Sequence, residues 1–203
     1  MARVIVITSG KGGVGKTTTT SNLGMALARL EHNTLLIDAD IGLRNLDLLL
    51  GLENRIIYTG VDVLNKTCRL EQALIQDKRQ QKLTFFPLSS SQSKTPITKS
   101  QIQELINLVE EKYDFILIDC PPSLSMLTVN AMAAADGVII PIQCEYYALE
   151  GLSALMNTIA RVADTINPNI TIEGLLRTMY DPRNSLTNDV SDQLMQHFGE
   201  RVY

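Results

Sequence analysis

The chain has 203 residues, of which 45% are hydrophobic and 20% charged, a composition typical of one soluble globular domain. Its net charge of -4 argues against an extended basic surface for nucleic acid and leaves room only for a local one. No apolar run approaches the roughly 20 residues that span a bilayer, the N-terminus does not read as a secretory signal, and the three cysteines are widely scattered. We therefore expect a cytoplasmic protein.

Apolar runs alternate with stretches of helical periodicity from the N-terminus onward. In chain order we predict strands at 4–7, 34–37, 83–87, 115–118, 138–142 and 170–178, and helices at 16–29, 100–112, 126–135, 149–166 and 186–198. Strands without polar alternation that are separated by helices imply a mostly parallel sheet with helices on both faces. The predicted fold class is α/β, and ligands are expected at the carboxyl ends of the strands. The polar stretch 89–96 is expected to be a surface loop.

The loop after the first predicted strand, residues 10–17, reads GKGGVGKT and satisfies the phosphate-loop pattern G-x-x-x-x-G-K-[ST]. Glycines let backbone N–H groups close around phosphate oxygens, and the following helix adds its positive end. We expect Lys16 to reach the β- and γ-phosphates of a nucleotide, Thr17 to ligate Mg²⁺ and Thr18 to bond the α-phosphate. The predicted nucleotide-binding residues of the loop are Gly10, Lys11, Gly12, Gly13, Val14, Gly15, Lys16, Thr17 and Thr18.

Two later strands end in carboxylates. The sequence LLIDAD ends in Asp38 and Asp40, and FILID ends in Asp119. An apolar run followed by aspartate has the Walker B form, whose carboxylate orients the water shell of a metal ion. We therefore predict Asp38 and Asp119 as metal-site residues together with Thr17. Each aspartate could instead lie in an ordinary turn, since two prolines follow shortly after Asp119.

The second lysine of the loop, Lys11, makes the motif KGGVGKTT resemble the deviant Walker A signature of the ParA/MinD group of P-loop ATPases. The resemblance implies a deviant Walker A P-loop fold that binds ATP and Mg²⁺ between two face-to-face subunits, with Lys11 reaching the partner's nucleotide. It also implies that Asp40 helps to place the attacking water and that residues 119–123 form a switch segment. The predicted catalytic residues are Lys11, Lys16 and Asp40, and the predicted adenine contacts are Met179, Tyr180 and Asp181.

Different parts of the chain resemble different branches of this group. Residues 1 to about 85, and 38–79 above all, resemble MinD, whereas residues from about 113 to 203 resemble the ParA/Soj partition ATPases. Members of the group usually continue further at the C-terminus. We therefore expect one P-loop ATPase domain over 1–203, without the last strand and helices of the family.

The resemblance implies a Mg²⁺-dependent ATPase whose ATP-bound homodimer acts as a switch for intracellular positioning, with a ParB-like or MinE-like activating partner. Chromosome or plasmid partition is favoured over MinD-type division-site placement, with non-specific DNA as a further partner and Arg183 as a local cation. Membrane binding is not expected without the C-terminal helix, whereas the full-length form would be nucleoid-associated or peripheral to the membrane. Two alternatives stay open: a nucleotide-binding module without turnover, and an iron–sulfur carrier using Cys120 and Cys144.

Overall fold

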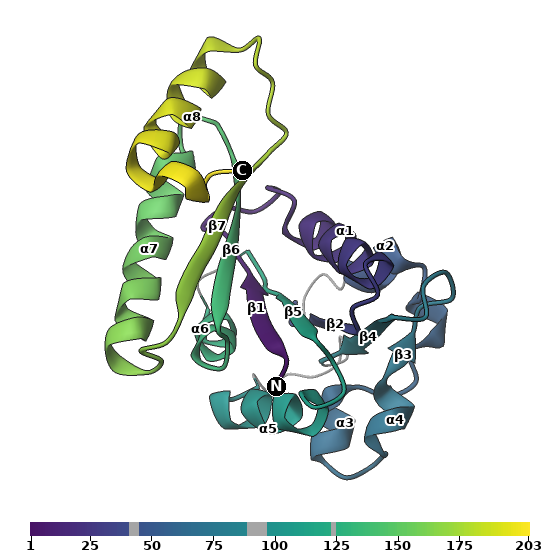
Figure 1. Ribbon diagram of the computed structural model, residues 1–203. Coiled ribbons are helices and arrows are strands. Elements are labelled where there is room, and N and C mark those ends of the chain that lie inside the picture. Colours follow the sequence, from purple (N-terminus) through teal and green to yellow (C-terminus); the bar gives the residue numbers. More distant parts are fainter. Residues whose placement is uncertain (41–44, 89–96, 123–124) are drawn as a thin grey trace.

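A single sheet organises the computed structural model of the chain, which describes residues 1–40, 45–88, 97–122 and 125–203 (Figure 1). Its strands follow the order β3-β4-β2-β5-β1-β6-β7. All neighbours pair in parallel except β3 and β4. The strands are β1 Arg3–Ile7, β2 Thr34–Asp38, β3 Ile75–Gln76, β4 Leu83–Pro87, β5 Phe115–Asp119, β6 Gly137–Gln143 and β7 Thr171–Thr178. The predicted mostly parallel α/β fold is confirmed, and only the short edge strand β3 was not predicted.

Five longer helices lie close to their predicted positions, and shorter ones fill the segment between β2 and β4. The predicted helices are α1 Lys16–Arg29, α5 Lys99–Val109, α6 Met126–Ala133, α7 Ala148–Thr165 and α8 Ser185–Phe198. Those not predicted are α2 Leu46–Leu50, α3 Gly60–Leu64 and α4 Leu70–Ala73, with the 3-10 turns η1 Glu53–Arg55 and η2 Gly199–Arg201. The predicted helix 100–112 was too long, because α5 ends at Val109. Within the described residues, no helix has the length and apolarity needed to cross a membrane.

The two faces of the sheet bury different helices. Alternation along β1 sends Ile5 and Ile7 to a core shared with α1 and α2, whereas Val4 and Val6 join the core under α5, α6 and α7. Since both faces of the central strands are covered, the residues inside β1, β2 and β5 are apolar, as expected for a parallel sheet. The polar residues that follow the strands are therefore gathered at one edge of the sheet, where β1, β2 and β5 end.

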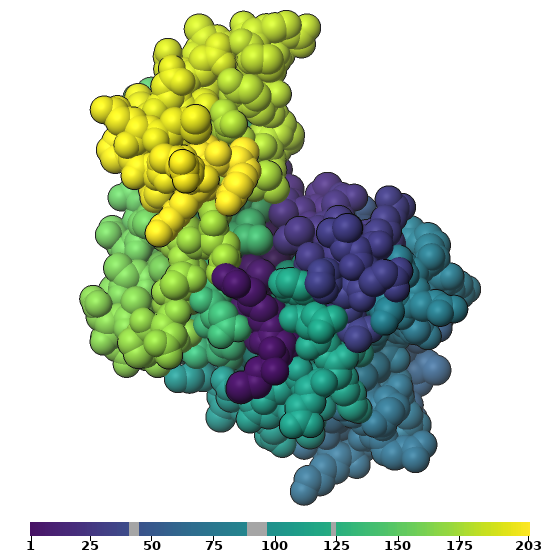
Figure 2. All heavy atoms as spheres, viewed as in Figure 1, coloured from purple at the N-terminus to yellow at the C-terminus, as the bar shows by residue number. Residues whose placement is uncertain are grey.

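The last residues of the chain pair with the edge strand β7. Val202 forms a parallel bridge with Leu175, and the Tyr203 N–H donates to the Leu175 carbonyl at 2.8 Å. The Arg177 N–H in turn donates to the Tyr203 carbonyl at 2.8 Å. Between this end of the chain and α1 lies a hollow of about 360 Å³, which is visible between the yellow and purple regions of Figure 2.

Candidate phosphate-binding site

The loop between β1 and α1 depends on glycine for two different physical reasons. Gly15 has a φ of 86°, a left-handed conformation that side chains disfavour, and it directly precedes the first turn of α1. Gly10 instead lies against α7, where a Cβ would stand 2.1 Å from the carbonyl oxygen of Gly151. The loop is thus shaped by its own backbone and held by close packing against a distant helix.

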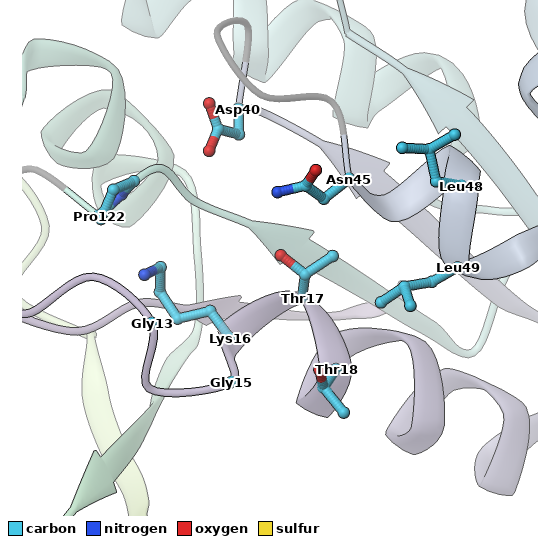
Figure 3. Close-up of a pocket in the computed structure, with 10 residues that line it drawn as sticks. All are labelled: Gly13, Gly15, Lys16, Thr17, Thr18, Asp40, Asn45, Leu48, Leu49 and Pro122. Atoms are coloured by element: carbon cyan, nitrogen blue, oxygen red, sulfur yellow. The ribbon is translucent and has the colours of Figure 1, made fainter.

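A cavity of about 430 Å³ opens above this loop (Figure 3). Ten residues line it: Gly13, Gly15, Lys16, Thr17, Thr18, Asp40, Asn45, Leu48, Leu49 and Pro122. Six of them were predicted as site residues, and Pro122 lies in the predicted segment 119–123, whose Ser123 is outside the described residues. Asn45, Leu48 and Leu49 were not predicted, because only the packing of α2 against α1 brings them to the loop.

Lys16 provides a buried cation at the floor of the cavity. Its side chain is 7% exposed, and its ammonium donates to the Lys11 carbonyl at 3.4 Å. Burial lowers the pKa of Lys16, while the charges of Asp119 and Asp40 oppose that effect. Figure 3 shows the amine directed into the cavity, with Asp40 facing the same space. An anionic group entering here would meet a preorganised positive charge.

Asp38 and Asp119 form a buried acid pair on the neighbouring strands β2 and β5, where their Cα atoms are in register. Burial, followed by the charge of Asp119, raises the pKa of Asp38 to about 7. Burial also raises the pKa of Asp119 to about 6, although a hydrogen bond from Thr17 and the charge of Lys16 oppose the rise. Neither carboxyl lines the cavity, but these contacts connect Asp119 to two residues that do.

The acid pair and Thr17 suit a magnesium ion in their chemistry. Carboxylate and hydroxyl oxygens are hard donors, and a divalent cation would offset the electrostatic cost of two buried carboxyl groups. In the described part of the chain, no three histidine, cysteine, aspartate or glutamate side chains meet as a complete metal site. Magnesium commonly takes several of its ligands from phosphates and water.

We expect Asp38→Asn to stabilise the ligand-free protein at pH 8. The pKa of Asp38 rises from an ordinary 3.8 to about 7 on folding. The native state therefore holds the extra proton between these values, and stability falls as the pH rises from about 4 to 7. The loss at higher pH is bounded at about 4 kcal/mol, and the amide removes it. Urea unfolding at pH 5 and pH 8 would show a smaller difference for the variant, and an equal difference would contradict this assignment.

Lys11 lies apart from the cavity floor that Lys16 occupies. Its ammonium stands 2.6 Å from the Glu145 carboxylate, and the two side chains are 40% and 46% exposed. The Gln143 amide also bonds Glu145. An exposed ion pair of this kind contributes at most about 1 kcal/mol and can be exchanged for a stronger contact. The side chain is thus held by Glu145 and does not line the cavity.

The remaining predicted residues lie at the margin of the site. Val14 belongs to the loop, and its carbonyl accepts a hydrogen bond from Thr178 at 2.8 Å at the end of β7. The predicted adenine contacts, residues 179–181, follow directly but do not line the cavity. Arg183, the predicted local cation, is ion-paired with Asp181 at 2.9 Å.

The cysteines offer little support for a cluster-bearing protein. Cys120 and Cys144 are both buried as free thiols in the core under α5, α6 and α7. Burial raises the pKa of both thiols, which disfavours the thiolate form that ligates metals. Their packing agrees with a structural role.

Comparisons with known proteins place the chain among its relatives. A family model described as an AAA domain matches residues 2–172. The septum site-determining protein MinD of Synechocystis sp. is 54% identical over 140 residues, which are 69% of this chain and 53% of that protein. An uncharacterised protein of Pseudomonas putida is 48% identical over 213 aligned positions, which cover 100% of this chain and 80% of that protein. The chain spans about half the length of the curated MinD relatives that it matches.

Solved structures extend the likeness to the fold. MinD in the MinC:MinD cell division complex of Aquifex aeolicus is 36% identical, with a TM-score of 0.77 over 95% of this chain and 78% of that one. MinD of Pyrococcus horikoshii, solved with Mg-ADP, is 29% identical, with a TM-score of 0.78 over 94% of this chain and 77% of that one. The family model covers most of the chain, and the TM-scores show that these structures share its fold. The chain belongs to the ParA/MinD family of P-loop ATPases.

Proposed function

We propose that the chain binds ATP with Mg²⁺ and hydrolyses ATP to ADP and phosphate. The observation that carries the proposal is one cavity in which buried Lys16 and the Thr17 hydroxyl lie above the acid pair of Asp38 and Asp119. A cation for phosphate oxygens and hard oxygen donors for a metal are what phosphoryl transfer requires. The Mg-ADP bound to the Pyrococcus horikoshii relative supports the same ligand class.

Each residue of the site has a distinct proposed role. Lys16 neutralises charge on the β- and γ-phosphates, and Thr17 with Asp38 and Asp119 holds the metal ion. Mg²⁺, when bound, supplies charge neutralisation on the phosphate oxygens. Asp40 faces the same cavity as Lys16 (Figure 3). Its carboxylate would accept a hydrogen bond from the attacking water and so orient the lone pair of that water toward the γ-phosphorus. The Asn45 amide, directed into the same space, is a second group able to hold that water.

The activity is tested by steady-state phosphate release from Mg-ATP by the purified chain. We expect release above that of a Lys16→Ala variant, because the alanine removes the buried cation while leaving the loop backbone in place. Release no greater than that of the variant would remove the ATPase proposal for this chain. A nucleotide-binding module without turnover would then be supported if labelled ADP still bound to the unaltered chain.

We further propose that ATP joins two copies of the chain face to face across the edge that carries the phosphate loop. Lys11 is held outside its own cavity, where it can reach the nucleotide of a partner. Exposed apolar side chains border the same edge: Leu48 and Leu49 line the cavity, and Tyr146 and Tyr147 follow Glu145. A grouping of exposed apolar side chains is typical of a protein interface.

The cellular role of this switch has two candidates. The likeness of residues from about 113 onward to ParA/Soj favours partition, with non-specific DNA and a ParB-like activator as partners. The identity to MinD relatives favours division-site placement with a MinE-like activator, and the Aquifex aeolicus relative assembles with MinC. We retain partition as the first candidate. Retardation of random-sequence DNA that weakens steeply with salt would support it, whereas ATP-dependent sedimentation with anionic liposomes and no DNA retardation would support division placement.

A further inference from the structure

A second cavity lies beside the nucleotide site, between α1, α2 and the turn that follows β3. Its volume is about 280 Å³, and its lining residues are Ser21, Asn22, Met25, Arg29, Leu49, Leu50, Arg79 and Gln80. Leu49 lines both cavities, so α2 forms the wall between them. A phosphate group fits easily, since a water molecule takes up only about 30 Å³ in the liquid.

One of its two guanidinium groups is held in a fixed orientation. Arg79 donates to the Asp77 carboxylate at 2.8 Å and 3.2 Å and to the Leu50 carbonyl at 3.2 Å. Asp77 is only 3% exposed and accepts the backbone N–H groups of Arg79 and Gln80 as well. The turn is thereby tied to the end of α2. Such a preorganised planar donor loses little further entropy when it binds an anion.

The other guanidinium group belongs to Arg29, and no carboxylate pairs with it in the described part of the chain. Arg29 ends α1, is exposed, and forms no ion pair or hydrogen bond through its side chain within the described residues. Asp77 offsets the charge of Arg79, but among the described residues that line the cavity none has a carboxylate. Ser21, Asn22 and Gln80 add polar groups to its wall. The lining therefore combines a net positive charge with hydrogen-bonding groups.

We propose that this cavity is a second anion site, which takes a small phosphate-bearing ligand between Arg29 and Arg79. The Arg29 guanidinium can bind phosphate oxygens through paired, charge-assisted hydrogen bonds, a geometry that suits phosphate better than chloride. The Nε and Nη2 groups of Arg79 already donate to Asp77 and Leu50, so Arg79 would offer its Nη1 group to the ligand. The site is separate from the phosphate loop, since none of the loop residues line it. Inorganic phosphate, pyrophosphate and the phosphate of a small metabolite share the required chemistry.

Pyrophosphate binding to a Lys16→Ala variant tests the proposal, because that background weakens the phosphate loop. Equilibrium dialysis with labelled pyrophosphate at low ionic strength should detect binding to Lys16→Ala. Adding Arg29→Gln should weaken it by about tenfold, the loss of one charge-assisted contact. Adding Arg161→Gln, which alters an exposed arginine of α7 outside the cavity, should leave it unchanged. Unlabelled phosphate and a phosphorylated sugar, compared at equal charge, can then compete with the labelled pyrophosphate. Stronger displacement by phosphate indicates the free ion as ligand, and stronger displacement by the sugar indicates a phosphorylated metabolite.

Two results would overturn the second site. Either Lys16→Ala binds no pyrophosphate, or Arg29→Gln in that background binds it as tightly as the parent. Because Arg29 is exposed at a helix end, its replacement should not unfold the chain, and a matching urea midpoint for the two proteins would verify this. The experiment uses neither ATP nor turnover. Failure of the second site is therefore distinguishable from failure of the proposed ATPase.

Discussion

Asp40→Ala is expected to slow ATP hydrolysis by roughly two to four orders of magnitude, the range lost with a group that assists proton movement. The Asp40 carboxylate faces the nucleotide cavity, and removing it leaves the attacking water without its main acceptor. The backbone N–H that donates to Asp38 at 2.9 Å is retained in the variant, so the acid pair keeps this contact. Nucleotide affinity should therefore change little.

The measurement combines single-turnover phosphate release with light scattering. If ATP joins two copies as proposed and hydrolysis ends that state, the variant should accumulate more dimer than the unaltered chain. Asp164→Ala, at an exposed position of α7, is the matched control and should behave like the unaltered chain. If Asp40→Ala released phosphate as fast as the unaltered chain, Asp40 would have no part in placing the water. Asn45 would then be the next residue to test for that role.

The long elements could be predicted from the sequence because each is long enough to show the hydrophobic pattern of a strand or of a helix. The run 115–118 is apolar throughout and 149–166 repeats at helical spacing, so both emerge almost as predicted, as β5 and α7. The helix α2 has five residues, and β3 has two. Neither is long enough to display a period, and each exists because it packs on a neighbour. The short elements between β2 and β4 could therefore be identified only from the structure.

The site also contains both kinds of residue: some belong to a local sequence motif, and others are brought to the site by the fold. Lys16, Thr17 and Asp119 could be predicted, because a short motif encodes both their chemistry and their place at a strand or helix end. Asn45 and Glu145 have no such motif, and their positions depend on how α2 and the end of β6 fold back toward the loop. Residues 179–181, which the family resemblance predicted as adenine contacts, do not line the cavity. That role stays a prediction.

The two lysines of the loop lie in different environments, and this difference indicates that they have different roles. Lys16 is buried and directed into the cavity of its own subunit, whereas Lys11 is half-exposed and paired with Glu145. Because Lys11 does not line the cavity, it is less well placed than Lys16 to contact a nucleotide bound there. In the proposed face-to-face dimer, it could instead contact the phosphate group of the other copy.

Lys11→Ala should accordingly abolish ATP-induced dimerisation while leaving most of the ATP affinity of the single subunit intact. Two symmetric lysine–phosphate contacts would be lost, each comparable to a charge-assisted hydrogen bond of about 1.5–3 kcal/mol. The dimerisation constant should then fall by roughly two to four orders of magnitude. The loop itself should persist, since the hydrogen bond from Lys16 ends on the backbone carbonyl of residue 11. Light scattering with ATP and equilibrium dialysis with labelled ATP measure the two quantities separately.

Glu145→Ala distinguishes this interface role from a role of the ion pair within one subunit. If Lys11 matters because it holds Glu145, both replacements should lower dimerisation alike. If Lys11 matters because it reaches the partner's phosphates, Glu145→Ala should leave ATP-induced dimers intact, since the lysine no longer has to leave a competing carboxylate. Lys99→Ala, at an exposed position of α5, controls for the loss of any single surface charge. Unchanged dimer formation by Lys11→Ala would contradict the bridging role, whatever the Glu145 variant does.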